Sequence, residues 1–360
     1  MKILQVIPYF CFGGAETMCE SLVYALLSLG HQVTVVSLYN ERTPISERME
    51  QSGVKILYLD KKLGLDLTMI PKLARIMGTE KPDVVHTHLD VIKYAAAAAR
   101  LKGIRRCVHT VHNVADKEAE GRLQKIINGT YFRLGWSVPV ALSPEVKRSI
   151  VSFYGIDGKN IPVIYNGTDL SHCIPKLHYH RDGLQLLHIG RFNEQKNHKG
   201  LLEAFSLIRR EIPESHLELI GDGVLRKEME RFAEELGVLE AVSFLGSRDN
   251  VYPHLHQADV FLLPSKFEGM PMTIIEAMGT GLPIVASAVG GVPDMLTNEE
   301  SGLLVSSEPE RIAEAVIRLS RDEALRECLG RKAKQESQRF SAEHMARSYC
   351  AVYKGEEGIL

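Results

Sequence analysis

Cysteine is scarce in this sequence of 360 residues, and no two cysteines stand at the short spacing that a metal site requires. No run approaches the roughly 18 apolar residues of a membrane-spanning helix. Scattered cysteines of this kind are typical of reduced thiols, so we expect a cytoplasmic protein. The six are Cys11, Cys19, Cys107, Cys173, Cys328 and Cys350.

The sequence also carries little net charge, −2 at pH 7, which argues against a protein that binds nucleic acid in general. The balance hides an asymmetry. Residues 1–170 hold 21 basic and 16 acidic side chains, whereas residues 171–360 hold 22 and 29. The basic first half indicates either contact with an anionic acceptor or membrane surface, or solvated charges that have no partner.

The first residues allow two interpretations. Lys2 followed by apolar residues to Phe12 resembles a weak signal peptide, but Gln5 and Pro8 interrupt the run. The same residues make a good first strand, which is the interpretation that we favour.

Strands and amphipathic helices alternate along the chain, and the pattern restarts after about residue 183. In the first half, Lys2–Ile7 reads as a strand and Glu16–Leu29 as the helix that follows it. In the second half, Leu184–Ile189 and Lys199–Arg210 repeat that order. The expected domains are residues 1–170 and 171–340, with a linker from Asn166 to Arg181. Residues 341–360 should form a helix that packs back on the first domain.

This alternation predicts an α/β protein made of two doubly wound, Rossmann-like parallel-sheet domains that face each other across a cleft. In such folds a ligand binds outside the carboxyl ends of the strands. The residues that follow each strand are therefore the first candidates for a site.

The segment from Phe267 to Gly281 is the most informative in the chain. A buried strand ends just before it, and a glycine and a proline, Gly269 and Pro271, form the entry to an apolar helix. A helix start presents unpaired N–H groups to an anion, and Pro271 fits its first turn. The two acids of the segment, Glu268 and Glu276, would repel an anion but can accept hydrogen bonds from hydroxyl groups. An anion joined to hydroxyl-rich sugars describes a sugar nucleotide.

A second segment, Gly190–Asn197, follows another strand directly. It places Arg191 and Lys196 in one loop, where a guanidinium fork and an ammonium group can hold phosphate oxygens. Considered alone, this loop is explained better by ordinary surface charges. Together with the Glu268–Glu276 segment at the same edge of the sheet, it predicts a diphosphate site.

The first half offers weaker candidates. Gly13 and Gly14 join the first strand to the first helix and allow a phosphate to approach the backbone. They do not form the G-x-G-x-x-G pattern, which lowers the odds of a nicotinamide or flavin enzyme. Several histidines end two strands, with no acidic or cysteine ligands to complete a metal site. His112 is our candidate for a hydrogen-bond donor or proton carrier. The others, which a role in the core explains better, are His86, His88 and His109.

These segments together resemble the retaining, nucleotide-sugar-dependent glycosyltransferases of family 4, which have the two-domain B architecture. The similarity covers nearly the whole chain. It runs through GGAE, the HTH and TVHN segments, IYNGTD, GRFNEQKN, LIGDG, and the stretch from EGMPMTIIEAMGTG to VGGVPDML. The specific part is the pair of glutamates separated by seven residues. The shorter motifs are weak one by one.

The resemblance implies a role for each matching residue. Arg191 and Lys196 match the cations that neutralise the donor diphosphate. Glu276 matches the carboxylate that holds the ribose, and Glu268 the one that contacts the donor sugar. His112 matches a histidine near the reacting sugar. The remaining donor-binding positions are Gly14, Gly269, Met270, Pro271 and Met272, and Met270 departs from the bulkier residue that the family often has there.

The implied activity is transfer of a sugar, with retained configuration, from a nucleotide-diphosphate sugar to a glycan, lipid-linked or other glycoconjugate acceptor, as in polysaccharide biosynthesis. UDP- and GDP-sugars are the expected donors, without a metal or cofactor, since no D-x-D pair follows a strand. A peripheral contact with the inner face of the membrane through the basic half is also expected. The alternatives are a non-catalytic nucleotide-sugar-binding protein and a phosphorylase or epimerase on the same architecture.

Overall fold

The structure is a computed structural model that describes residues 1–11, 13–119, 121–176 and 183–356. The chain divides into two compact units. The first contains Met1–Thr168 and the C-terminal segment that begins at Ala342, and the second contains Asp169–Ser341. Part of the expected linker, residues 177–182, lies outside the described residues.

The first unit is built on a parallel sheet of six strands in the order β3-β2-β1-β4-β5-β6. This order places β1 and β4 side by side at the centre, where the chain reverses its direction of winding. The strands are β1 (Lys2–Ile7), β2 (Gln32–Ser37), β3 (Lys55–Tyr58), β4 (Val84–His88), β5 (Arg106–Val111) and β6 (Val138–Ala141).

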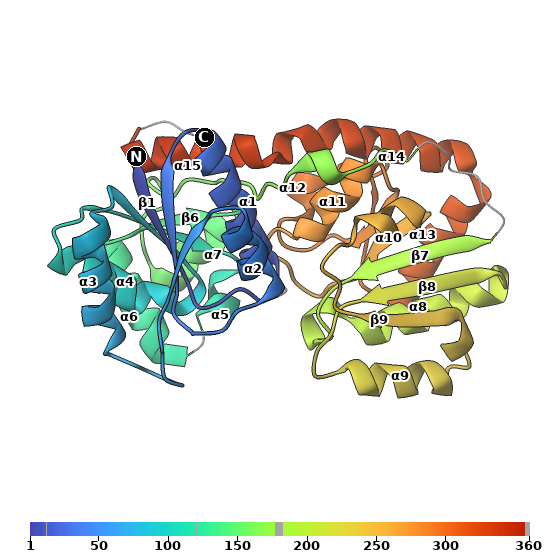
Figure 1. Ribbon diagram of the computed structural model, residues 1–360. Helices are drawn as coiled ribbons and strands as arrows, with labels where there is room; N and C mark the ends of the chain where they lie inside the picture. The colour runs from blue at the N-terminus through green and yellow to red at the C-terminus, as the bar shows by residue number, and fades with distance from the viewer. Residues whose placement is uncertain (12, 120, 177–182, 357–360) are drawn as a thin grey trace. The chain divides into compact units, whose positions relative to one another are not determined.

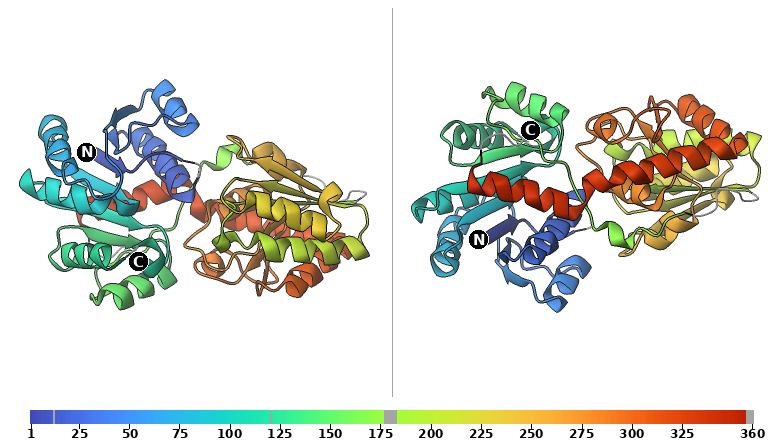
Figure 2. Two further views of the ribbon diagram at one scale, coloured as in Figure 1. Left: turned by 90° about the horizontal axis from the view of Figure 1, so that it is seen from below. Right: turned by 90° about the horizontal axis from the view of Figure 1, so that it is seen from above.

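Helices cover both faces of this sheet (Figures 1 and 2), which is why its central strands are buried almost without a break. The helices are α1 (Gly14–Ser28), α2 (Pro44–Gln51), α3 (Met69–Glu80), α4 (Ile92–Leu101), α5 (Ala115–Glu118), α6 (Gly121–Arg133), α7 (Pro144–Tyr154) and α15 (Ala342–Lys354). A short 3-10 turn, η1 (Leu89–Val91), joins β4 to α4.

The C-terminal helix α15 packs against α1 within the first unit (Figure 1). Its residues Tyr349 and Tyr353 stand one turn apart and are almost fully buried. The last helix of the chain therefore contributes to the core of the first unit.

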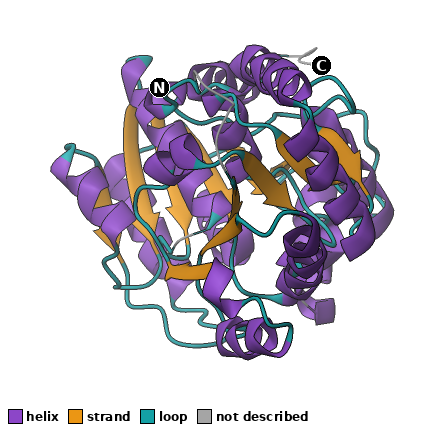
Figure 3. Cartoon of the chain, turned by 90° about the vertical axis from the view of Figure 1, so that its right-hand side faces the viewer, coloured by secondary structure: helices purple, strands orange, loops and turns teal. Residues whose placement is uncertain are grey.

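The second unit repeats the plan with a parallel sheet in the order β12-β11-β10-β7-β8-β9. Figure 3 shows the strands and the surrounding helices of both units in separate colours. The strands are β7 (Leu184–Ile189), β8 (Ser215–Ile220), β9 (Val242–Gly246), β10 (Val260–Leu263), β11 (Ile284–Ser287) and β12 (Leu303–Val305).

Helix α11 is the buried helix of this unit, because its sequence is apolar on nearly every side. It ends at Gly281, whose φ of 74° gives the left-handed cap that glycine accepts most easily. The helices are α8 (His198–Glu211), α9 (Arg226–Glu235), α10 (Tyr252–Gln257), α11 (Met272–Thr280), α12 (Val292–Met295), α13 (Pro309–Arg321) and α14 (Glu323–Ser337). The 3-10 turns are η2 (Leu170–His172), η3 (Glu194–Lys196), η4 (Leu239–Ala241) and η5 (Gln338–Phe340).

The sequence-based fold class is confirmed: the chain is an α/β protein with two doubly wound parallel sheets. Some details differ. The first helix starts at Gly14 rather than Glu16, because Gly13 serves as its extended N-cap. Pro271 is likewise the N-cap of α11, with an extended ψ of 121°, and not a residue of its first turn. The short strands β6 and β12 carry too few residues for a clear pattern.

Candidate active site

The loop after β7 is held in shape by its own polar side chains. Asn193 accepts a hydrogen bond from the backbone N–H of Lys196 at 3.2 Å and so caps the turn η3. Asn197 adopts a left-handed conformation, with φ of 53°, and its amide donates to the carbonyl oxygens of Pro264 and Ser307 at 3.2 and 3.3 Å. The loop is therefore tied to the carboxyl end of β10.

Glycines let neighbouring segments approach this loop. A Cβ on Gly221 would lie 2.1 Å from the carbonyl oxygen of Gly190, and one on Gly223 would lie 2.4 Å from that of Phe192. Both distances are too short for any side chain, and both glycines have positive φ. The Leu219–Gly223 segment thus fits against the loop only because it carries no Cβ at these two places.

Lys196 and Glu268 form an ion pair, with 2.6 Å between Nζ and Oε1. Their side chains are 16% and 5% exposed, so the pair is only weakly screened by water. Gln195 lies beside it and donates to the carbonyl oxygen of Phe267 at 3.0 Å and to Glu268 Oε2 at 3.4 Å. An ammonium group has three donors. Among the described residues Lys196 uses one of them, on Glu268, which leaves two for another anion.

The backbone around Glu268 is fixed by a second glycine pair. Gly290 has φ of 58°, and a Cβ there would lie 1.7 Å from the carbonyl oxygen of Glu268. The N–H of Gly291 donates to the carbonyl oxygen of Gly269 at 2.9 Å. The loop that follows β11 therefore holds the entry to α11.

Glu276 is a buried carboxylate on the otherwise apolar helix α11, with 7% of its surface exposed. Its carboxylate makes no hydrogen bond or ion pair with any residue that the structure describes. Burial raises the pKa of this carboxyl to about 7. An unpartnered carboxylate in such a place is costly to keep, and hydroxyl donors of a ligand would satisfy it.

The start of α11 offers further polar groups. Its first N–H groups have no acceptor within the helix. The hydroxyl of Thr273, in the first turn, is buried and has no hydrogen-bond partner among the described residues, and the same holds for Ser265 after β10. Met270 and Met272, on either side of Pro271, are each 4% exposed and place buried apolar side chains near these groups in the sequence.

Arg191 and Gly14 are both exposed. Arg191 follows Gly190 directly after β7, and Gly14 begins α1. The structure thus brings together Lys196, Glu268 and the entry to α11. Arg191 lies in the same loop as Lys196, and Gly14 and His112 belong to the other unit.

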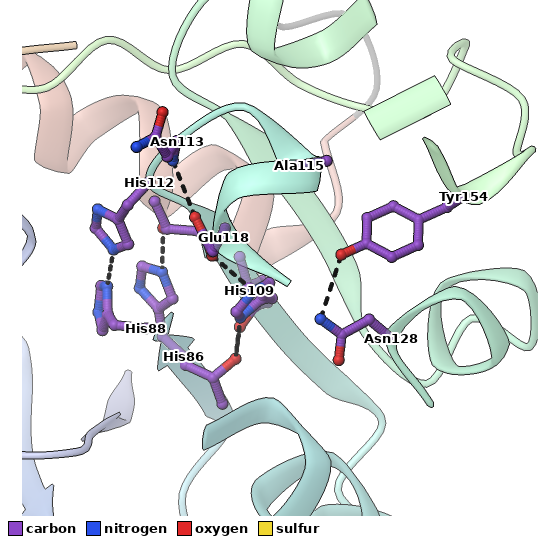
Figure 4. Close-up of polar contacts among 12 residues, drawn as sticks. His86, His88, His109, His112, Asn113, Ala115, Glu118, Asn128 and Tyr154 are labelled. Atoms are coloured by element: carbon purple, nitrogen blue, oxygen red, sulfur yellow. Dashed lines mark hydrogen bonds and ion pairs between the residues drawn. The ribbon is translucent and has the colours of Figure 1, made fainter. Parts of the chain in front are cut away.

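Four histidines on or directly after β4 and β5 lie near one another, and each makes hydrogen bonds (Figure 4). His112, which follows β5, joins its Nε2 to Nδ1 of His88 at 3.0 Å. His109 shares a hydrogen bond of 2.9 Å with Thr87, and its Nε2 lies 3.5 Å from a carboxylate oxygen of Glu118. His86, His88 and His109 are all buried and hydrogen-bonded, which confirms their interpretation as core histidines.

Burial lowers the pKa of His112 to about 4 and holds the pKa values of His86 and His88 well below their usual range. All three rings are therefore neutral at pH 7. His112 is the exception in exposure, since this residue, directly after β5, is only partly buried, whereas the other two are fully buried.

Sequence reasoning missed several of these groups. Gln195, Thr273 and Ser265 stand beside predicted residues, but their types are common in ordinary loops.

Within residues 1–11, 13–119, 121–176 and 183–356, no group of three or more His, Cys, Asp and Glu side chains could hold a metal ion. In the same residues, no helix is both long and apolar enough to cross a membrane.

Comparison with known proteins identifies the two halves of the chain. Residues 12–172 match Glycosyltransferase Family 4, and residues 175–336 match the family described as glycosyl transferases group 1. The chain therefore belongs to the family 4 glycosyltransferases, and it is an enzyme of glycosyl transfer.

Relatives and solved structures agree with this. The chain is 28% identical over 320 residues to the UDP-Gal:alpha-D-GlcNAc-diphosphoundecaprenol alpha-1,3-galactosyltransferase of Escherichia coli, covering 80% of this chain and 83% of that protein. It is 25% identical over 357 residues to the N-acetylgalactosamine-N,N'-diacetylbacillosaminyl-diphospho-undecaprenol 4-alpha-N-acetylgalactosaminyltransferase of Campylobacter jejuni, covering 93% and 94%. The crystal structure of Anabaena HepE in complex with UDP-glucose superposes with a TM-score of 0.86 at 20% identity, covering 99% and 100%.

The superposition shows that the two parallel six-stranded sheets have the GT-B fold of glycosyltransferases, as the sequence predicted.

Proposed function

We propose that this enzyme transfers a sugar from a nucleotide-diphosphate sugar, with retention of configuration, to a glycan or lipid-linked acceptor. One observation supports this most strongly. The segment from β10 to α11 carries a carboxylate paired with a lysine, Glu268, and a buried carboxylate without a partner, Glu276. That combination suits a ligand with both phosphate and hydroxyl groups.

The donor diphosphate is assigned to Lys196, Arg191 and the start of α11. Within the described part of the chain, Lys196 has two donors left after its bond to Glu268, and Arg191 stands in the same loop. The hydroxyl of Thr273 lacks a partner in the described chain, and it would add a neutral donor beside the N–H groups at the start of α11. Together they would stabilise the charge that develops on a departing diphosphate.

The two glutamates are assigned to hydroxyl groups. Glu276 would accept hydrogen bonds from the ribose diol, which would satisfy its carboxylate. Glu268 would accept from hydroxyls of the transferred sugar, since its pairing with Lys196 leaves lone pairs on both oxygens. Gly269, Met270, Pro271 and Met272 would line the donor with backbone and apolar surface.

A front-face displacement fits this assignment best. Retention through a covalent intermediate needs a second carboxylate as nucleophile, about 5 Å from the first. Glu268 is held by a lysine and is therefore a poor nucleophile. Instead, the bond from the anomeric carbon to the diphosphate breaks as the acceptor oxygen approaches from the same side. The acceptor's proton passes to the departing phosphate oxygen, so no metal or cofactor is required.

The first unit would supply the acceptor side of the reaction. Gly14, exposed at the start of α1, would let the backbone approach the donor phosphate. His112 would make a hydrogen bond to a hydroxyl close to the reacting carbon. Its neutral state at pH 7 suits a group that exchanges hydrogen bonds with sugar hydroxyls.

A UDP-sugar is the first donor to test. The relative from E. coli is named for UDP-Gal, and the HepE structure contains UDP-glucose. The relatives from E. coli and Campylobacter jejuni are both named for acceptors linked to diphosphoundecaprenol, a lipid. We therefore favour a lipid-linked acceptor over a free glycan.

A surface of the first unit suits a lipid carrier. Helix α6 exposes two apolar side chains, Leu123 at 59% and Ile126 at 63%, next to the exposed cations Arg122 and Lys125. We call these four residues the α6 patch. Apolar groups flanked by cations are typical of contact with anionic lipid, and this patch would dock the enzyme on the inner face of the membrane.

The first experiment is a donor panel of UDP-, GDP- and ADP-linked sugars, followed by thermal shift and by release of the nucleotide. One donor should raise the melting temperature and be consumed in the presence of a lipid-linked or glycan acceptor, with no effect of a chelator. Binding without transfer or slow hydrolysis would indicate a non-catalytic protein. Conversion of the donor alone would indicate an epimerase, and absorbance from bound pyridoxal phosphate a phosphorylase.

Flotation with liposomes tests the α6 patch. The wild-type protein should float with anionic vesicles and not with neutral ones, and replacement of Leu123 and Ile126 by serine should abolish this. Leu101→Ser is the control, because Leu101 is 71% exposed at the other end of a neighbouring helix, α4. Equal recovery with both kinds of vesicle would remove the membrane contact from the proposal.

A further inference from the structure

A buried polar chain connects the C-terminal helix to His112. Gln5 on β1 and His86 and His88 on β4 lie on one face of the central sheet, since β1 and β4 pair in parallel with Gln5 opposite His86. Thr110 on β5 pairs with His88 and shares this face. All four are fully buried.

Hydrogen bonds run through these groups without interruption. Tyr353 on α15 lies 2.7 Å from His86 Nδ1, and its hydroxyl accepts a longer bond of 3.5 Å from Gln5 Nε2. Gln5 Oε1 lies 2.8 Å from His88 Nε2, and His88 Nδ1 lies 3.0 Å from His112 Nε2. Figure 4 shows the last of these contacts, between the rings of His88 and His112.

A branch of the chain reaches the same helix at a second point. His86 Nε2 lies 2.8 Å from Thr110 Oγ1, which lies 2.7 Å from the hydroxyl of Tyr349. The His86 and His88 rings are 4.3 Å apart between centroids. Each histidine of this hydrogen-bonded chain is thus held by a partner on at least one neighbouring strand or helix.

The hydrogen-bonded chain determines which ring nitrogen of His88 and of His112 carries the proton. A carbonyl oxygen can only accept, so Gln5 Oε1 requires the proton of His88 on Nε2. In a neutral ring this leaves Nδ1 of His88 as an acceptor. His112 must then donate from its Nε2, and its own Nδ1 becomes an acceptor. That Nδ1 makes no hydrogen bond within the described part of the chain, so it is open to a ligand.

The surroundings keep the rings neutral, as this argument needs. The charged or titratable groups near His112 and His88 are His86, His109 and Glu118. Glu118 alone favours a protonated ring, and burial outweighs it. The hydroxyls of Tyr349 and Tyr353 on α15 also stay neutral, because burial raises the pKa of both.

We propose that Gln5 and His88 are positioning residues that hold His112 in the tautomer with its proton on Nε2, so that Nδ1 accepts a hydrogen bond from a substrate hydroxyl. Tyr353 anchors Gln5 from the C-terminal helix. The bond between His112 and a substrate hydroxyl rests on the proposed function, whereas the tautomer of His112 does not depend on that function. His112 is then an acceptor of a hydrogen bond and not a donor.

The test reads the tautomer directly, without activity. The chain has 14 histidines, and long-range proton–nitrogen correlation on ¹⁵N-histidine-labelled protein shows which ring nitrogen carries the proton. His112→Gln and His88→Gln assign the two signals. We expect protons on Nε2 of both rings in the wild-type protein. A proton on His112 Nδ1 would overturn the proposal even if the enzyme transfers no sugar.

Two substitutions of Gln5 test the cause. Gln5→Leu removes the acceptor and should give mixed tautomers at His88 and His112, with kcat lower by about 10-fold and KM for the donor unchanged. Gln5→Glu keeps an acceptor oxygen and should restore the wild-type tautomer and most of kcat. If Gln5→Leu leaves the tautomers unchanged, the proposal fails. Should Gln5→Leu not fold, Tyr353→Phe, which loses only the anchor, should show a smaller shift of the same kind, and no shift would count against it.

Discussion

Two clusters of buried polar groups, one in each unit, differ in whether their members have hydrogen-bond partners. In the first unit, Gln5, His86, His88 and Thr110 are neutral, and each is hydrogen-bonded to a neighbouring strand or to α15. In the second unit, the carboxylate of Glu276 and the hydroxyls of Thr273 and Ser265 are buried without partners in the described residues.

The cluster in the first unit is a complete hydrogen-bond network, whereas the cluster in the second unit is an incomplete one. A satisfied network makes its protein rigid, and losing one partner leaves another group unpaired. An unsatisfied group costs stability until a ligand supplies the missing partner. The cluster in the second unit should therefore gain stability from a bound donor, whereas the cluster in the first unit is already hydrogen-bonded without one. The predictions below test this contrast, from the largest expected effect to the smallest.

Lys196→Ala should have the largest effect. Loss of a cation at the leaving diphosphate should lower kcat by roughly 10²- to 10³-fold. It also leaves Glu268 buried without its partner, so the melting temperature should fall. Adding Glu268→Gln should restore the melting temperature but not the turnover. Lys227→Ala, an exposed lysine on α9, is the control, and wild-type turnover in Lys196→Ala would remove Lys196 from the site.

Glu268→Gln should distinguish contacts with the transferred sugar from contacts with the nucleotide. Because Glu268 is assigned to hydroxyls of the transferred sugar, kcat should fall by about 10- to 100-fold while UDP alone binds nearly as before. Calorimetry with UDP and initial rates with the UDP-sugar measure the two effects. Equal losses in both would argue against a contact with the sugar.

Glu276→Gln should weaken donor binding by about 10-fold, since hydrogen bonds to a charged acceptor are lost. The wild-type affinity should also rise as the pH increases through about 7, where this carboxyl loses its proton. UDP-glucose is the suitable ligand, because its phosphates do not titrate in this range. The variant should show no such dependence, and Glu228→Gln, exposed on α9, should behave as wild type.

Stability of the ligand-free protein should show the reverse trend. The pKa of Glu276 is raised in the folded state, so the folded state holds this proton more tightly than the unfolded state does. Its contribution is complete below pH 4.5, the ordinary value, and is lost as the pH rises through about 7. Glu276→Gln should therefore melt above wild type at pH 8 and close to it at pH 5. A constant difference across this range would contradict the burial of an unpartnered carboxylate.

The smallest effects compare two hydroxyls directly. Tyr349→Phe breaks the completed network at Thr110 and should cost about 1–3 kcal/mol of stability without changing donor affinity. Thr273→Val removes an unpartnered hydroxyl and should leave stability unchanged or higher, but weaken donor binding. Thermal unfolding and calorimetry on both variants measure this. If the two variants showed the same pattern, the contrast between the units would not hold.

Much of the fold could be predicted because it follows from periodicity. The runs that became β1, β7 and β10 are apolar and short, and Gly30 and Gly281 follow helices as left-handed caps. Strand β12 has only three residues and β6 has a proline among its four, so neither carries a clear strand pattern of its own, and both depend on their neighbours in the sheet.

The residues of the site could be predicted from the sequence, but the direct contacts between them could not. The strand-loop-helix order indicated Glu268, Glu276 and Lys196, whereas the direct pair between Lys196 and Glu268 depends on how two loops meet at one edge. The histidine chain was missed for a related reason. Its signal was the alternation of polar residues at Gln5, at His86 and His88, and at Thr110 and His112, which can be read only when the order of the strands is known.

A crystal structure with a bound UDP-sugar tests the central claim most directly. The diphosphate should contact Lys196 and the start of α11, the ribose hydroxyls should donate to Glu276, and a sugar hydroxyl should donate to Glu268. A donor bound in another part of the chain, with the Glu276 carboxylate still unpartnered, would contradict the account.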